Sequence, residues 1–218
     1  MTALSYNVRR PLLIVSTLTI AVAALAAQVQ RDPSPDGSVS AQVLGHWGPP
    51  VPPSPQPSYT GGKWIDITFG RPIKRERELW GSGADYGKML NSGAPVWRAG
   101  ANVSTRLKTE VPLVVGAKTM PAGEYSLFID LKPNAWTLIV SSWPAQASHD
   151  PNNKAALWGS FNYTPDRDVV RVRMKLETLP HSFETLSWQF LDMTNTSGTI
   201  ALVWDRTLAS VPFKVGGM

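Results

Sequence analysis

The chain has 218 residues, among them 19 prolines, nine tryptophans, three histidines and no cysteine. The lack of cysteine excludes disulfides, thiolate zinc sites, iron–sulfur clusters and a cysteine nucleophile. Hydrophobic residues make up 43% of the chain, which suits a soluble globular protein, whereas charged residues make up only 17%, below the usual quarter or so. The length predicts one domain with a tail.

The first 26 residues have the order of a secretory signal peptide. Arg9 and Arg10 precede an uncharged apolar run over residues 11–27 that includes Ala24-Leu25-Ala26, a small-x-small site. We expect residues 1–26 to be a cleaved signal peptide or, as the alternative, an uncleaved N-terminal membrane anchor. Either form predicts export from a bacterial cytoplasm to the periplasm or the extracellular space. Without Arg9 and Arg10 the chain keeps 19 basic against 16 acidic residues, so no nucleic-acid partner is predicted.

Residues 27–62 contain eight of the 19 prolines, all between Pro33 and Pro57. Proline lacks an amide donor and fixes φ, so such a segment favours an extended, solvated chain. We predict a flexible stalk that spaces the domain from a membrane and is dispensable for folding. The alternative is a ligand for a proline-recognising module.

From residue 63 the sequence alternates between apolar and polar residues. Val170, Val172 and Met174, for example, alternate with Arg171 and Arg173. This period of two predicts strands with one face on a core and one in water. The strands are expected over residues 64–69, 104–109, 113–115, 123–131, 136–140, 169–176, 184–192, 199–206 and 211–215. The prediction for residues 63–216 is a single all-β domain, an antiparallel β-sandwich or jelly-roll-like barrel of about seven to nine short strands.

A first candidate site is the basic segment between Arg71 and Gly81. Arg71, Lys74, Arg75 and Arg77 could contact an anion or a glycan. The favoured alternative is a solvated loop in which the two glutamates of the same segment pair with these bases.

A second candidate site is the segment Pro95–Asn102. The guanidinium of Arg98 matches a planar carboxylate, and the indole of Trp97 can stack on a sugar ring. The alternative is that Trp97 is a core residue and that Arg98 forms a structural ion pair. We predict that a small ligand would be bound where Arg71, Trp97, Arg98 and Asn102 converge.

No pattern in the sequence predicts a catalytic residue, a metal site or a cofactor. His46, His149 and His181 have no metal-ligand spacing, and nucleophile-elbow and phosphate-loop motifs do not occur. An enzyme is therefore the less favoured hypothesis. It would use a pair of carboxylates as acid and base, drawn from Asp66, Glu110, Asp130 and Asp192.

Several motifs in order resemble the bacterial family called domain of unknown function 2911. They are Ile65–Pro72, Val96–Asn102, Val115–Phe128 and Ala201–Asp205, within a resemblance that covers about residues 63–216. The resemblance implies export and a compact domain, and it names no activity. It also implies that Arg71, Trp97, Arg98, Gly100 and Asn102 are a recurrent polar cluster without a known role.

This chain departs from the family pattern at three loops. Residues 75–77 replace a usual glycine, residues 89–94 are a short insertion, and residues 142–157 replace an asparagine-rich turn. These differences affect a site formed by loops more than they affect the fold.

The favoured functional hypothesis is a non-enzymatic, exported binding module of the cell envelope. Its partner would be an envelope polysaccharide, a small anionic ligand or an envelope protein. The alternatives are a hydrolase or lyase that acts on an envelope polymer, and a purely structural envelope component. The sequence sets no oligomeric state.

Overall fold

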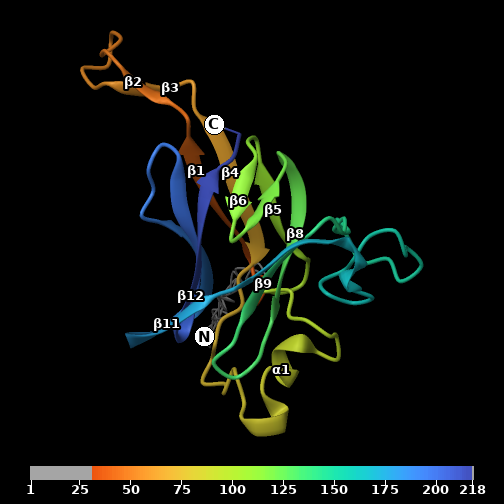
Figure 1. Ribbon diagram of the computed structural model, residues 1–218. Helices are drawn as coiled ribbons and strands as arrows, with labels where there is room; N and C mark the ends of the chain where they lie inside the picture. The colour runs from red at the N-terminus through yellow and green to blue at the C-terminus, as the bar shows by residue number, and fades with distance from the viewer. Residues whose placement is uncertain (1–30, 218) are drawn as a thin grey trace, which may run out of the picture. The chain divides into compact units, whose positions relative to one another are not determined.

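A computed structural model describes residues 31–217, which form an antiparallel all-β fold (Figure 1). The larger sheet has six strands in the order β1 (Asp36–Val43), β4 (Lys63–Gly70), β5 (Thr105–Thr109), β8 (Gly123–Asp130), β9 (Thr137–Ser141) and β10 (Asp168–Arg173). The smaller sheet has four strands in the order β11 (Lys175–Leu191), β12 (Ser197–Val215), β6 (Leu113–Val115) and β7 (Lys118–Met120). The chain passes between the two sheets three times: after β5, after β7, and at Met174 between β10 and β11.

The remaining elements are short. Strands β2 (His46–Gly48) and β3 (Ser58–Thr60) form a separate hairpin, which projects from the sheets in Figure 1. The helices within residues 31–217 are α1 (Lys88–Asn91) and the 3₁₀ turns η1 (Gly83–Asp85) and η2 (Pro165–Arg167). No helix in this described range has the length and apolar character needed to cross a membrane.

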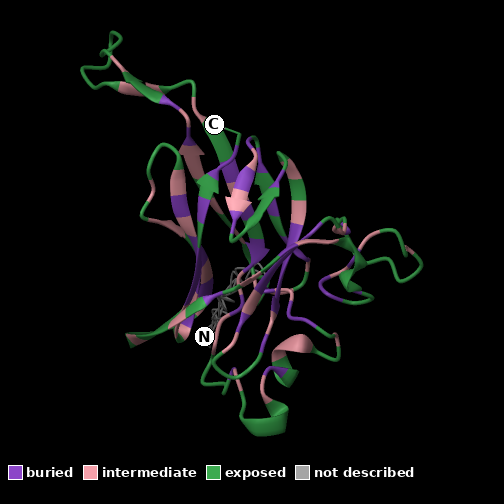
Figure 2. Ribbon diagram, in the orientation of Figure 1, coloured by how far each residue is buried: buried purple, intermediate pink, exposed green. Residues whose placement is uncertain are grey.

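The two sheets enclose one hydrophobic core. Inward side chains of the larger sheet, such as Ile65, Ile67 and Leu107, belong to the same buried cluster as Leu186 and Leu202 of the smaller sheet. Figure 2 shows the buried residues along the strands, whereas the loop between β2 and β3 is exposed. The sheets are open at their edges, so the predicted all-β sandwich is confirmed and the barrel alternative is not adopted.

The larger sheet is also covered on part of its outer face. Phe128 and Ile139 point away from the main core and pack with Leu157 and Tyr163 in a second buried cluster. The covering segment is the long connection between β9 and β10. This is why Leu127, Phe128 and Ile129 are all buried in succession, although a strand with one wet face would alternate.

Part of the segment predicted to be a stalk is a strand. Residues 36–43 form β1, which pairs with β4 from Asp36 opposite Gly70 to Val43 opposite Lys63. The eight prolines flank this stretch and none lies within it, while Val39, Ala41 and Val43 keep a period of two. Residues 46–60 are the β2–β3 hairpin and its proline-rich loop. The predicted signal peptide, residues 1–26, lies outside the described residues.

The strands are also more numerous and less uniform than predicted. Twelve strands occur within the described range, and two of them, β11 and β12, are 17 and 19 residues long. Pro212 lies inside β12, although proline within a sheet is usually confined to edge strands. The pairing of β12 with β11 ends at Ser210 and its pairing with β6 begins at Phe213, so the missing amide of Pro212 lies between the two ladders.

Candidate functional site

A groove of about 350 Å³ opens beside α1, where the segments that follow β4 and precede β5 meet the smaller sheet. Its polar lining includes Arg75, Arg77, Arg98 and Asn102, and its apolar lining includes Met89, Leu90, Trp97 and Trp204. Three arginines and no carboxylate line this groove, which is hereafter called the arginine groove.

Packed tryptophans form the floor of the arginine groove. The rings of Trp97 and Trp204 are stacked with centroids 6.0 Å apart, and Trp80 packs edge-on against both. Trp97 and Trp204 are each only 1% exposed. The backbone of Trp97 is also paired with Ile129 of β8, through N–H···O contacts of 2.9 and 2.8 Å. Trp97 is therefore a core residue that contributes only a small part of its indole to the groove.

Arg98 is partly buried and has no carboxylate partner in the described part of the chain. Its Nη1 donates a hydrogen bond of 2.8 Å to the carbonyl oxygen of Asn102, and its guanidinium carbon lies 5.4 Å from the ring centre of Phe161. Burial lowers the pKa of Arg98 from its ordinary value. A buried cation without a counter-charge is costly, so this arrangement favours the approach of an anion.

Gly159 allows the guanidinium of Arg98 to take this position. A Cβ atom at residue 159 would lie 2.6 Å from Nη1 of Arg98, and the backbone there has a φ of +62°. Glycine has no Cβ to collide with the guanidinium, and it adopts the left-handed conformation more readily than other residues. The connection that covers the larger sheet thus also contacts the guanidinium of Arg98, through Gly159 and Phe161.

Arg75 and Arg77 are held by backbone carbonyls, not by the acidic residues beside them. Arg77 donates from Nε to the carbonyl of Lys74 at 2.8 Å, and its guanidinium carbon lies 5.9 Å from the ring centre of Trp204. Arg75 donates from Nη2 to the carbonyl of Pro33 at 3.3 Å. The expected pairing of Glu76 and Glu78 with these bases is not seen: within residues 31–217 neither glutamate forms an ion pair with them.

The backbone around the groove is unusual for residues other than glycine. Arg75, Glu76, Ala99 and Asn102 all have left-handed conformations, with φ of 48°, 61°, 50° and 58°. Such conformations cost about 1–2 kcal/mol each for most residues, and they concentrate at functional sites. At Ala99 the loop is fixed from outside, because its carbonyl accepts hydrogen bonds from the Thr105 hydroxyl at 3.1 Å and the Trp188 indole at 3.0 Å.

The structure brings together three of the four residues predicted to bind a ligand. Trp97, Arg98 and Asn102 line the arginine groove, but Arg71 is not among the lining residues. The amide of Arg71 donates to the carbonyl of Pro35 at 2.8 Å, and its aliphatic chain lies across Gly37 of β1. Arg71 thus follows the inward alternation of β4 and packs against the neighbouring strand.

In the sequence, Arg75 and Arg77 belong to a candidate site separate from that of Arg98. No sequence pattern indicates Trp204 or Gly159 as a site residue. The signal for the two arginines was the basic segment itself, which lies directly after the Arg-Pro pair. No sequence signal placed Gly159 beside Arg98, because the two are 61 positions apart and meet only through the folded connection.

The carboxylates of the alternative enzyme hypothesis lie on different elements. Asp66 is on β4 and accepts a hydrogen bond from Ser40, Glu110 follows β5, and Asp130 ends β8 beside Arg171. Asp192 lines a different groove, which none of the other three lines. Among the described residues, no three His, Asp or Glu side chains gather where they could hold a metal ion.

Comparison with known proteins gives one family match. The family described as "Protein of unknown function (DUF2911)" matches residues 53–213, which contain the whole arginine groove except its Pro33–Ser34 edge. No curated protein and no solved structure matches the chain.

Proposed function

Because the chain belongs to the DUF2911 family, whose description assigns no activity, we propose a function from the groove itself. The protein is a non-enzymatic binding module of the cell envelope, and the arginine groove is its site for an anionic ligand.

The observation that carries this proposal is the charge imbalance at Arg98. Its guanidinium is partly buried and lacks a carboxylate within the described residues, and the other charged residues lining the groove are Arg75 and Arg77. A ligand anion would supply the missing counter-charge. A guanidinium donates two parallel hydrogen bonds to the two oxygens of a carboxylate, so a carboxylate is the anion that fits Arg98 best.

The apolar lining adds a second requirement for the ligand. Met89, Leu90 and the accessible part of Trp204 offer apolar surface next to the three guanidinium groups. A uronic acid unit carries a carboxylate on a ring with apolar faces, and therefore satisfies both conditions. Such a unit occurs in an acidic polysaccharide and also as a free small anion, which the experiment below distinguishes.

Calorimetric titration with oligogalacturonate, monomeric galacturonate and neutral dextran tests the proposal. We expect the oligomer or the monomer to bind in a way that depends on Arg98, whereas any heat from dextran should be the same for the unmodified protein and for Arg98→Gln. Arg98→Gln should weaken binding by about tenfold to a hundredfold, because a charged hydrogen bond contributes roughly 1.5–3 kcal/mol. Arg173→Gln is the matched control, since Arg173 is an exposed arginine on β10 that lies outside the groove.

Two results would contradict the proposal. One is the absence of binding to either acidic probe by a protein that melts cooperatively. The other is an Arg98→Gln variant that binds as tightly as the Arg173→Gln control. If only the monomer binds, the ligand is a free small anion and not a polysaccharide.

The export part of the proposal rests on the sequence of residues 1–26. A basic segment, an apolar run and the Ala24-Leu25-Ala26 site support secretion through a cleaved signal peptide. Cell fractionation followed by determination of the N-terminal residue tests it. A mature N-terminus near residue 27 in the envelope fraction is expected, whereas an intact Met1 in the cytoplasm would contradict export.

A further inference from the structure

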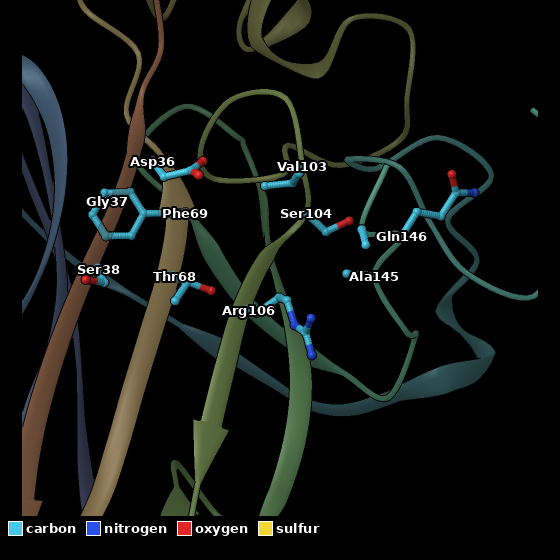
Figure 3. A pocket seen from close by; sticks show the side chains of 11 residues that line it. Asp36, Gly37, Ser38, Thr68, Phe69, Val103, Ser104, Arg106, Ala145 and Gln146 are labelled. Carbon is cyan, nitrogen blue, oxygen red and sulfur yellow. The ribbon is translucent and has the colours of Figure 1, made fainter. Parts of the chain in front are cut away.

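A second groove, of about 360 Å³, lies on the outer face of the larger sheet (Figure 3). Strands β1, β4 and β5 form its base, with Asp36, Thr68 and Arg106 among the lining side chains. Residues 145–147 of the connection between β9 and β10 form its wall. Figure 3 shows Ala145 and Gln146 on that wall, across the gap from Asp36 and Thr68.

The wall of this second groove is held by hydrogen bonds within its own connection and is joined by one further hydrogen bond to Ser104, directly before β5. The buried Gln146 donates from Nε2 to the carbonyls of Asn153 and Ala156, at 3.0 and 2.9 Å, and accepts the amide of Asp150 at 2.8 Å. The Ser104 hydroxyl of the groove donates to the carbonyl of Gly159 at 2.6 Å. The groove is therefore preformed, which lowers the cost of ordering it around a ligand.

The base of the groove offers polar groups that no protein partner satisfies. Ser38 of β1 lies opposite Thr68 of β4, and both residues are exposed, with no protein partner for either hydroxyl within residues 31–217. The same is true of the Asp36 carboxylate, which forms no ion pair there. Two hydroxyl groups and a carboxylate together can accept and donate several hydrogen bonds to a ligand.

The cations on this face, Arg106 and Lys108, have a carboxylate beside them, in contrast to the arginines of the arginine groove. Arg106 pairs with Glu124 of the neighbouring strand, and Lys108 lies 3.9 Å from the same carboxylate. Asp66 accepts a hydrogen bond of 2.6 Å from the Ser40 hydroxyl. An anionic ligand would gain little here, because the cations already have partners.

An exposed tryptophan extends the same face. Trp64 is 44% exposed and shares the outward side of β4 with Asp66 and Thr68, since Ile65 and Ile67 point into the core. Trp64 and Thr68 are four residues apart, which spans about 14 Å along a strand. An indole at one end and free hydroxyls at the other are the features of a site for a ring-containing, uncharged polar chain.

We propose that this outer face, from Trp64 to the groove beneath residues 145–147, binds a neutral glycan. One sugar ring stacks on the Trp64 indole, and the hydroxyls of a further sugar hydrogen-bond to Asp36, Ser38 and Thr68. The proposal is independent of the anionic ligand assigned to the arginine groove, since the two sites share no lining residue.

Native gel electrophoresis in gels that contain a neutral polysaccharide tests the proposal. The probes are dextran, laminarin and hydroxyethyl cellulose, each compared with a gel that lacks polysaccharide. We expect at least one probe to retard the protein. Trp64→Ala should weaken that retardation about tenfold in polysaccharide concentration, and Asp36→Ala should weaken it less, because the carboxylate supplies only hydrogen bonds.

Trp47→Ala is the matched control, because Trp47 is 71% exposed but lies on the β2–β3 hairpin. It should be retarded like the unmodified protein, and so should Arg98→Gln. The proposal is overturned if none of the three polysaccharides retards the protein. It is also overturned if Trp47→Ala abolishes retardation while Trp64→Ala does not, which would assign glycan binding to the hairpin.

Discussion

The arginine groove and the outer face of the larger sheet both contain arginine and tryptophan, but the two regions differ in whether the arginine has a carboxylate partner and whether the tryptophan ring is exposed. In the groove Arg98 has no carboxylate partner, and Trp97 and Trp204 are buried. On the sheet face Arg106 is paired with Glu124, and Trp64 is exposed. The same residue types therefore suit different ligands, because what distinguishes the sites is the pairing of the charge and the exposure of the ring.

The largest expected difference between the two regions is in stability. Trp97→Ala should lower the free energy of unfolding by about 3–5 kcal/mol, because it leaves a large cavity in the core. Trp64→Ala should change it by less than about 1 kcal/mol, because the side chain is partly in water already. Urea unfolding of the two variants measures both values. A similar loss for both would mean that the sheet face is covered and is not free to bind.

The second largest expected difference between the two sites is the salt dependence of their binding affinity. Screening weakens the attraction between the guanidinium groups and an anion, so affinity for oligogalacturonate should fall about tenfold between 0.02 and 0.3 M sodium chloride. Retardation by a neutral polysaccharide should change by less than about twofold. Calorimetry and native gels at the two salt concentrations provide the comparison. Salt-independent binding of the acidic probe would show that apolar contact, not charge, dominates the groove.

The pH dependence of acidic-ligand binding should be weak. Burial lowers the pKa of Arg98, but an arginine begins from a value so high that it stays protonated in the range where proteins are studied. The ligand carboxylate is ionised above about pH 5. Affinity should therefore be constant between about pH 5 and pH 9 in calorimetric titrations. A steep loss within that range would indicate that a histidine or carboxylate of the protein takes part.

The smallest expected effect concerns a matched charge pair near the arginine groove. Burial tends to raise the pKa of Asp205, but hydrogen bonds from Lys74 and Ser182 outweigh it and lower the pKa overall. A carboxyl with a lowered pKa contributes stability above its unfolded pKa, and loses it as the pH falls through the folded value. Asp205→Asn should melt slightly below the unmodified protein at pH 7 and equally at pH 2. A constant difference at both pH values would contradict an ionic role for Asp205.

Sequence periodicity predicted the strands of the core because their inward residues are uniformly apolar. It predicted the strand at residues 123–131 but not the burial of Phe128 on its outer face, since the covering connection lies further along the sequence. It also failed at β1, because a count of prolines over residues 27–62 obscured the alternation of Val39, Ala41 and Val43 between them.

The candidate site was predicted only where its residues are close together in the sequence. Trp97, Arg98 and Asn102 lie within six residues of one another, so their proximity follows from the chain itself. Arg71 does not line the groove with these three residues, because it continues the inward alternation of β4 and its aliphatic side chain packs against Gly37. The positions of Arg77 and Trp204 depend on how the segment after β4 crosses the smaller sheet, which no local pattern indicates.

Nuclear magnetic resonance of the arginine side chains during titration with oligogalacturonate shows which guanidinium groups bind the anion. Variants of individual arginines assign the Nε–H signals. The signals to follow are those of Arg98, Arg77 and Arg106. We predict that the chemical shifts of Arg98 and Arg77 change in a saturable way. The chemical shift of Arg106, which is already paired with Glu124, should not change. Shifts at Arg106 with none at Arg98 would contradict this prediction and would assign the anion to the sheet face.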